Sequence, residues 1–163
     1  MNPEWSWAAV PLAGAAGFGV GRRRSAGPAG PGASPWARVL LVTDPEPGDV
    51  PGGALLVAWR LVGSGGVLHV LAPVVLPLSV PLEAPPGDET DRATAVLRDV
   101  ERWVGAKGIT VHGHLRRGRT LRTLVRETMD RVQADAAVLH CKPEALPDLV
   151  GAVAPALPVV VPY

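Results

Sequence analysis

The sequence is nearly free of cysteine, with Cys141 alone among 163 residues. It therefore cannot form an internal disulfide, and it cannot supply the several thiolates of a cysteine-based zinc site. This excludes the small secreted scaffolds that disulfides hold together, and a reducing cytoplasm is the compartment that fits best.

An excess of charge of either sign is also missing. The formal net charge is +1, and only 19% of the residues are charged. The part up to residue 36 carries +2, from three arginines (Arg22, Arg23 and Arg24) against Glu4, which leaves −1 for the remainder. A nearly neutral body lacks the basic surface by which proteins hold nucleic acid, so we expect no nucleic-acid partner. Apolar residues make up 47%, enough for the core of one domain with an appended segment.

The amino-terminal segment contains a long stretch without charged residues. Residues 5–21 are uncharged and rich in Ala and Gly, begin with two tryptophans, and end at the arginine cluster 22–24. A helix of this length would cover roughly 25 Å, slightly less than a ~30 Å hydrocarbon core, and Trp and Arg are typical of membrane interfaces. Two interpretations follow for residues 1–24: a flexible soluble tail, or association of residues 5–24 with a membrane or a membrane protein. The second would hold a cytoplasmic body at the inner face of the cell membrane.

Residues 25–36 alternate Pro, Gly, Ala and Ser without apolar periodicity, which is typical of a linker. The domain proper is therefore expected over residues 37–163. Apolar runs predict five strands, at residues 38–44, 67–75, 109–115, 136–140 and 158–162. Apolar spacings of three and four predict helices between them, at residues 54–62, 88–105, 120–132 and 144–156.

Strands that alternate with helices predict an α/β fold, with an open parallel sheet covered by helices on both faces. Five segments, in this order and spacing, are similar to the universal stress protein family: RVLLVTD, GVLHVLAPV, GITVHGHLRRG, DAAVLHC and LPVVVPY. This resemblance implies a five-stranded sheet with the strand order 3-2-1-4-5. It also implies a homodimer that forms through the last strand, residues 158–162.

Ligands of open parallel sheets bind beyond the carboxyl ends of the strands, where the strand order reverses. This rule and the resemblance together make Asp44, Gly118 and His140 the candidate ligand-binding residues. Asp44 matches the residue that lies near the ribose and adenine in nucleotide-binding members of the family. It is also explained as a strand-end residue whose side chain hydrogen-bonds the following turn.

The loop after the fourth strand departs from the family pattern. Nucleotide-binding members carry a glycine-rich loop there, because backbone N–H groups close on phosphates where no Cβ intervenes. Here residues 140–148 are HCKPEALPD, in which two prolines remove donors and two carboxylates add negative charge. We therefore expect no ATP cofactor held in the family's manner. The sequence favours a nonenzymatic regulatory or small-ligand-binding module; the alternative is a soluble protein that binds ATP or AMP.

Three histidines invite a metal interpretation. His112 and His114 share one face of their strand, and His69 lies on the predicted neighbouring strand. No carboxylate is clearly placed to join them, and His140 is three strands away in the implied order. We therefore expect half-buried histidines and no metal site.

Other reactive residues give no catalytic constellation. Neither Ser64 nor Ser79 has the strand-turn-helix elbow of a hydrolase nucleophile, and Cys141 has no identifiable base. We expect no catalytic residue. An arginine cluster (Arg116, Arg117 and Arg119) precedes the amino terminus of the third helix, where it is either an anion site or an exposed basic loop.

Overall fold

The computed structural model of this chain describes residues 36–43, 52–62 and 65–161. Strands and helices alternate strictly through these residues. They are β1 (Arg38–Thr43), α1 (Gly52–Val62), β2 (Val67–Val75), α2 (Asp88–Gly105), β3 (Thr110–Gly118), α3 (Leu121–Val132), β4 (Ala136–His140), α4 (Leu146–Val153) and β5 (Val159–Val160).

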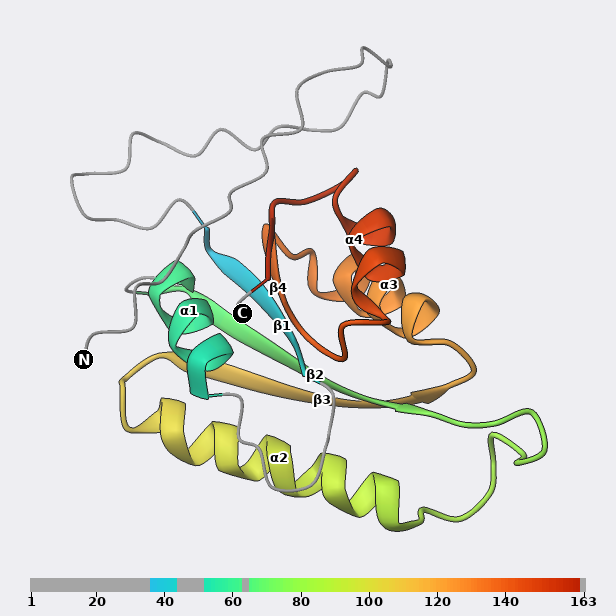
Figure 1. Cartoon of the computed structure of the whole chain (residues 1–163). Coiled ribbons are helices and arrows are strands. Elements are labelled where there is room, and N and C mark those ends of the chain that lie inside the picture. The colour runs from blue at the N-terminus through green and yellow to red at the C-terminus, as the bar shows by residue number, and fades with distance from the viewer. Residues whose placement is uncertain (1–35, 44–51, 63–64, 162–163) are drawn as a thin grey trace, which may run out of the picture.

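The strands form one sheet in the order β3-β2-β1-β4-β5, and every neighbouring pair is parallel. This confirms the predicted α/β fold and strand order. Helices α1 and α2 cover one face of the sheet, and α3 and α4 cover the other (Figure 1). The N-terminal segments 1–24 and 25–35 lie outside the described residues, so the predicted extension, its membrane association and the linker stay predictions. Among the described residues, no helix combines the length and apolarity needed to cross a bilayer.

Strand β1 is the centre of the fold because both of its faces are buried. Val39 and Leu41 pack with residues of α1 and α2, whereas Leu40 and Val42 pack with residues of α3 and α4. Successive side chains of a strand point to opposite faces, so a strand between two helical layers must be apolar at nearly every position. The short uninterrupted run after Arg38 satisfies that requirement.

Helix α1 begins two residues earlier than predicted, at Gly52, and three other elements also differ in extent from the sequence prediction. Strand β3 continues to Gly118, because it pairs with β2 as far as Val75. Helix α4 covers only Leu146–Val153, with Pro147 in its first turn, where a missing N–H costs nothing. Strand β5 has two residues, and it is the outer strand on its side of the described sheet, as a dimer through residues 158–162 would require. That dimer stays a prediction.

A lysine joins the two helices of one layer. The Nζ atom of Lys107 lies 5.8 Å from the ring centroid of Trp59 on α1 and 5.4 Å from that of Trp103 on α2. Both distances fall within the range of cation–π attraction. Trp36, directly before β1, also packs against the core of this layer.

The arginines near the end of β3 are neither an exposed basic loop nor an open anion site. Arg117 donates from Nη1 to the carbonyl oxygen of Ala84 at 2.7 Å. Arg119 donates from Nη1 to the carbonyl oxygens of Pro77 and Val80 at 2.5 and 2.7 Å. These bonds fasten the proline-rich loop 77–86 to the sheet, while Arg116 pairs with a glutamate of α3, Glu127, at 2.7 Å.

Replacing Arg119 with alanine is expected to loosen loop 77–86. The change removes two charge-assisted hydrogen bonds, so amide hydrogen exchange in the loop should rise by about 5–10-fold. Mass spectrometry of peptic peptides measures this directly. Arg126→Ala removes an exposed arginine of α3 and serves as the matched control, with unchanged exchange in the loop. Equal exchange in both variants would show that the arginine does not hold the loop.

Candidate functional site

The point where strand order reverses lies between β1 and β4, two strands that are neighbours in space but distant in sequence. At their carboxyl ends Thr43 of β1 is the register partner of His140 of β4. Alternate residues of a strand share one face, so Thr43 lies on the face of Val39 and Leu41, and His140 lies on the face of Ala136 and Val138. Both side chains therefore point toward the α1 and α2 layer. The structure thus places a hydroxyl and an imidazole side by side at the position where ligands of such sheets bind.

Both groups have a buried polar atom that the described chain leaves without a partner. Thr43 is 0% exposed, and its Oγ1 makes no hydrogen bond. The Nδ1 atom of the half-buried His140 is likewise unpartnered. An unsatisfied buried polar atom costs about 1–3 kcal/mol, and such groups are uncommon in folded proteins. Two of them on adjacent strand ends indicate a place that a polar ligand would complete.

The loop that leaves β4 has few donors to offer. Ala145 N–H donates to the Lys142 carbonyl at 3.0 Å, and Leu146 N–H donates to the Pro143 carbonyl at 3.4 Å. Pro143 and Pro147 have no N–H at all. In the segment that stands in place of a glycine-rich loop, two backbone donors are therefore used internally and two positions have no donor.

The three residues predicted from sequence do not form one cluster. Asp44 lies outside the described residues, so its placement stays a prediction. Gly118 ends β3, with β2 and β1 between it and β4. A Cβ at Gly118 would lie 2.7 Å from Cδ2 of Leu124 on α3, so the glycine serves the packing of strand and helix. Only His140 lies at the point where the strand order reverses, and its register partner there, Thr43, was missed.

The histidines of β2 and β3 gather on the opposite face of the sheet. The register partner of His69 is His112, and their ring centroids are 5.5 Å apart. The Nδ1 atom of His69 lies 3.1 Å from the Nε2 atom of His114, within hydrogen-bond distance. All three share the face of Leu71, which packs toward α3 and α4. The prediction that His112 and His114 share a face is therefore confirmed, and His69 lies on the same face.

Two of these imidazoles, those of His69 and His114, have lowered pKa values, which favours their neutral form. Burial lowers the pKa of His69 to about 4, helped by the neighbouring His114, His112 and Arg38. Burial also lowers the pKa of His114. Among the described residues, no group of three His, Cys, Asp or Glu side chains is arranged to hold a metal ion as it stands.

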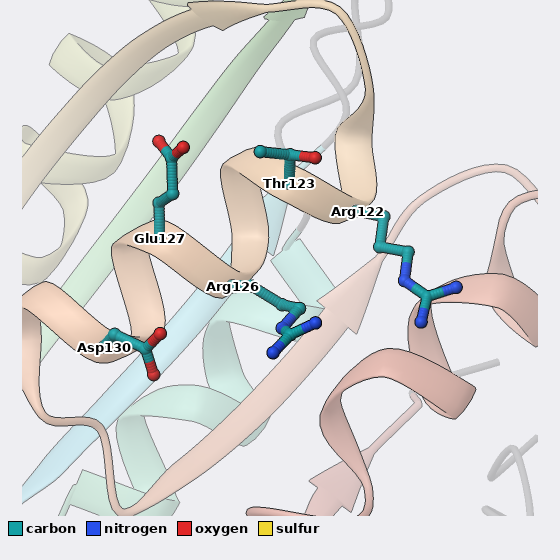
Figure 2. A pocket seen from close by; sticks show the side chains of 5 residues that line it. All are labelled: Arg122, Thr123, Arg126, Glu127 and Asp130. Carbon is teal, nitrogen blue, oxygen red and sulfur yellow. The ribbon is translucent and has the colours of Figure 1, made fainter.

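A shallow hollow of about 290 Å³ lies on the outer surface of α3. Figure 2 shows that its five lining side chains all come from this one helix: Arg122, Thr123, Arg126, Glu127 and Asp130. No second element closes it, and charges of both signs line it. We therefore place no ligand there. Cys141, half-buried at the end of β4, packs beside the α3 and α4 core.

Comparison with known proteins finds likeness in structure alone. No protein-family model and no curated protein matches the sequence. A protein of the universal stress protein family from Burkholderia pseudomallei superimposes with a TM-score of 0.61 at 15% identity, covering 78% of this chain and 96% of that one. The universal stress protein from Archaeoglobus fulgidus in complex with dAMP gives 0.58 at 17%, covering 77% and 97%. A universal stress protein family protein from Arabidopsis thaliana with AMP bound gives 0.56 at 17%, covering 77% and 90%. The chain therefore has the universal stress protein fold.

Proposed function

We propose that this protein is a nonenzymatic small-ligand-binding module that takes a nucleoside monophosphate in the crevice between the ends of β1 and β4. The observation that carries the proposal is the pair of unpartnered polar atoms, Oγ1 of Thr43 and Nδ1 of His140, on register-paired residues. A sugar hydroxyl or a base nitrogen of a bound nucleoside would satisfy them. Solved proteins of the same fold with AMP or dAMP bound support this class of ligand.

A monophosphate is favoured over a triphosphate by the chemistry of residues 141–148. A triphosphate needs a row of free backbone donors, which glycine-rich loops supply. Here two donors are bonded within the turn, two are replaced by proline, and Glu144 and Asp148 would repel added phosphates. A single phosphate can face solvent and does not need this grip.

Among the described residues at the ends of β1 and β4, we identify no catalytic constellation. A hydrolase acting on a nucleotide would need a nucleophile with a base in reach, or a metal-bound water. Among the described residues the hydroxyl of Thr43 has no hydrogen-bonded base, and no three-ligand metal group stands ready. We therefore propose binding without turnover.

Thr43→Val is the sharpest test, because valine keeps the shape of threonine and removes only the hydroxyl. In the ligand-free protein the variant should be more stable by about 1 kcal/mol, since an unsatisfied buried hydroxyl disappears. Its affinity for AMP should fall by about 5–10-fold, since the same hydroxyl is a ligand contact. Chemical denaturation and isothermal titration calorimetry measure the two effects.

A gain in stability together with a loss of AMP affinity distinguishes a binding role of the Thr43 hydroxyl from a packing role. A variant that loses stability and keeps its AMP affinity would contradict the proposal. Thr128→Val is the control, because the buried Thr128 hydroxyl donates to the Leu124 carbonyl at 2.7 Å and lies in α3. It should leave AMP affinity unchanged. Titration with ATP is the second arm, and ATP binding about tenfold tighter than AMP would overturn the choice of a monophosphate.

A further inference from the structure

The histidine cluster of β2 and β3 has the composition and spacing of an incomplete metal site. His112 and His114 come from one strand, and His69 comes from its neighbour, so three imidazoles leave the same face of the sheet. Three histidines with an open fourth position form a known type of zinc site. The cluster plays no part in the crevice between β1 and β4, which opens on the other face.

Two donor atoms already stand at the separation that a shared ion requires. Zinc–nitrogen bonds of about 2.0–2.1 Å at angles from square to tetrahedral place neighbouring nitrogens about 2.9–3.4 Å apart. The Nδ1 atom of His69 and the Nε2 atom of His114 are 3.1 Å apart. Their rings are tilted by 31° to each other, with centroids 5.3 Å apart.

The proton between these nitrogens does not block an ion. A neutral imidazole carries its proton on either nitrogen, and the ring that donates in the present hydrogen bond can hold that proton on its other nitrogen instead. Both lone pairs then face the ion, and no proton need leave the protein. Half-burial of both side chains restricts their rotation, which lowers the entropy cost of binding.

The third ligand requires one side chain to turn. His112 is exposed, and its ring stacks on that of His69 at a centroid distance of 5.5 Å, with 27° between the planes. This is why no three-ligand group is formed as the chain stands. Rotation of an exposed histidine about its side-chain bonds is inexpensive, and solvent would supply the remaining position.

The cationic side chains nearby are largely compensated. Arg38 lies 3.9 Å from the Asp135 carboxylate, and Arg116 pairs with Glu127 at 2.7 Å. Arg131 of α3 also acts on His114, and it is an exposed side chain that solvent screens. Their repulsion disfavours hard ions held by charge alone, so the cluster suits ions that bind imidazole strongly.

We propose that His69, His112 and His114 form a binding site for one divalent transition-metal ion of the zinc, nickel or copper type. The site lies on the α3 and α4 side of the β2–β3 pair. It is independent of the nucleotide crevice, so either proposal can fail without the other.

Calorimetric titration of the tag-free full chain with Zn²⁺ at neutral pH tests this proposal. We expect one ion per chain, and no response to Mg²⁺, which prefers oxygen ligands. His69→Ala should weaken Zn²⁺ binding by about tenfold or more, and His112→Ala should weaken it to a smaller extent. Because His112 is exposed, its replacement leaves the fold intact even if His69→Ala proves unstable.

His140→Ala is the matched control, since this histidine belongs to β4 and the other site. It should keep the wild-type Zn²⁺ affinity. Absence of Zn²⁺ binding by the wild-type chain would overturn the proposal. So would equal affinities of wild type, His69→Ala and His112→Ala, or a loss confined to His140→Ala.

Discussion

Leu40→Ala is expected to lower the free energy of unfolding by about 2–5 kcal/mol. Leu40 is 0% exposed in the central strand, with His69 of β2 and Ala137 of β4 as its register partners. It belongs to the core between the sheet and the α3 and α4 layer. Alanine there removes apolar contacts and leaves a cavity that neighbouring strands, held by hydrogen bonds on both sides, cannot fill by moving.

Chemical denaturation of wild type and variant measures this loss. Leu78→Ala is the control, because it removes the same atoms from a side chain that is 88% exposed in loop 77–86. Its effect should stay within about 0.5 kcal/mol. Similar losses in the two variants would mean that burial in the β1 layer does not dominate stability.

Gly66→Ala is expected to cost about 3 kcal/mol, the upper end of the usual range for overpacking. A Cβ at this position would lie 2.6 Å from the Val62 carbonyl oxygen and 3.0 Å from the Ala37 carbonyl oxygen. Both are backbone atoms, and the second also accepts the Val67 N–H at 2.8 Å, so neither can withdraw without loss. The close approach of three chain segments at the start of β2 therefore requires glycine.

The same substitution in α4 should have the opposite sign. No atom lies within 4 Å of a Cβ built on Gly151. Alanine in a helix interior is more favourable than glycine by about 0.8–1.0 kcal/mol, so Gly151→Ala should raise the free energy of unfolding. Thermal and chemical denaturation of both variants check the pair, and two changes of the same sign would contradict the packing argument at Gly66.

Local patterns carried enough information to predict the elements and their order. The apolar run of β1 and the spacing of Ala93, Val100 and Val104 in α2 are properties of neighbouring residues, and both elements are confirmed. Threonine is a favoured residue at a helix amino terminus, and the hydroxyl of Thr120 accepts the Thr123 N–H at 3.2 Å. The parallel order followed from alternation and from resemblance. The ends of the elements were harder to predict from sequence, because β3 is prolonged only by its pairing with β2.

The site depends on register between distant strands, which one sequence does not display. His140 could be chosen because it ends a strand, but its pairing with Thr43 joins residues almost a hundred positions apart. Likewise, Arg117 and Arg119, at the end of β3 and just after it, are placed on the carbonyls of loop 77–86 by tertiary contacts. The approach of His69 to His114 required a diagonal contact across two strands. In each case the residue type was visible and its partner was not.

The placement of tryptophan on one side of the sheet gives the molecule an internal optical probe. Trp36, Trp59 and Trp103 all belong to the α1 and α2 layer. After Trp103 the sequence contains no Phe or Trp, and its one Tyr is Tyr163. Intrinsic fluorescence from the described residues therefore reports on this helical layer near the amino ends of the strands. Loosening of that layer should alter the emission, whereas a colourless ion on the histidine face, across the sheet, should leave it nearly unchanged.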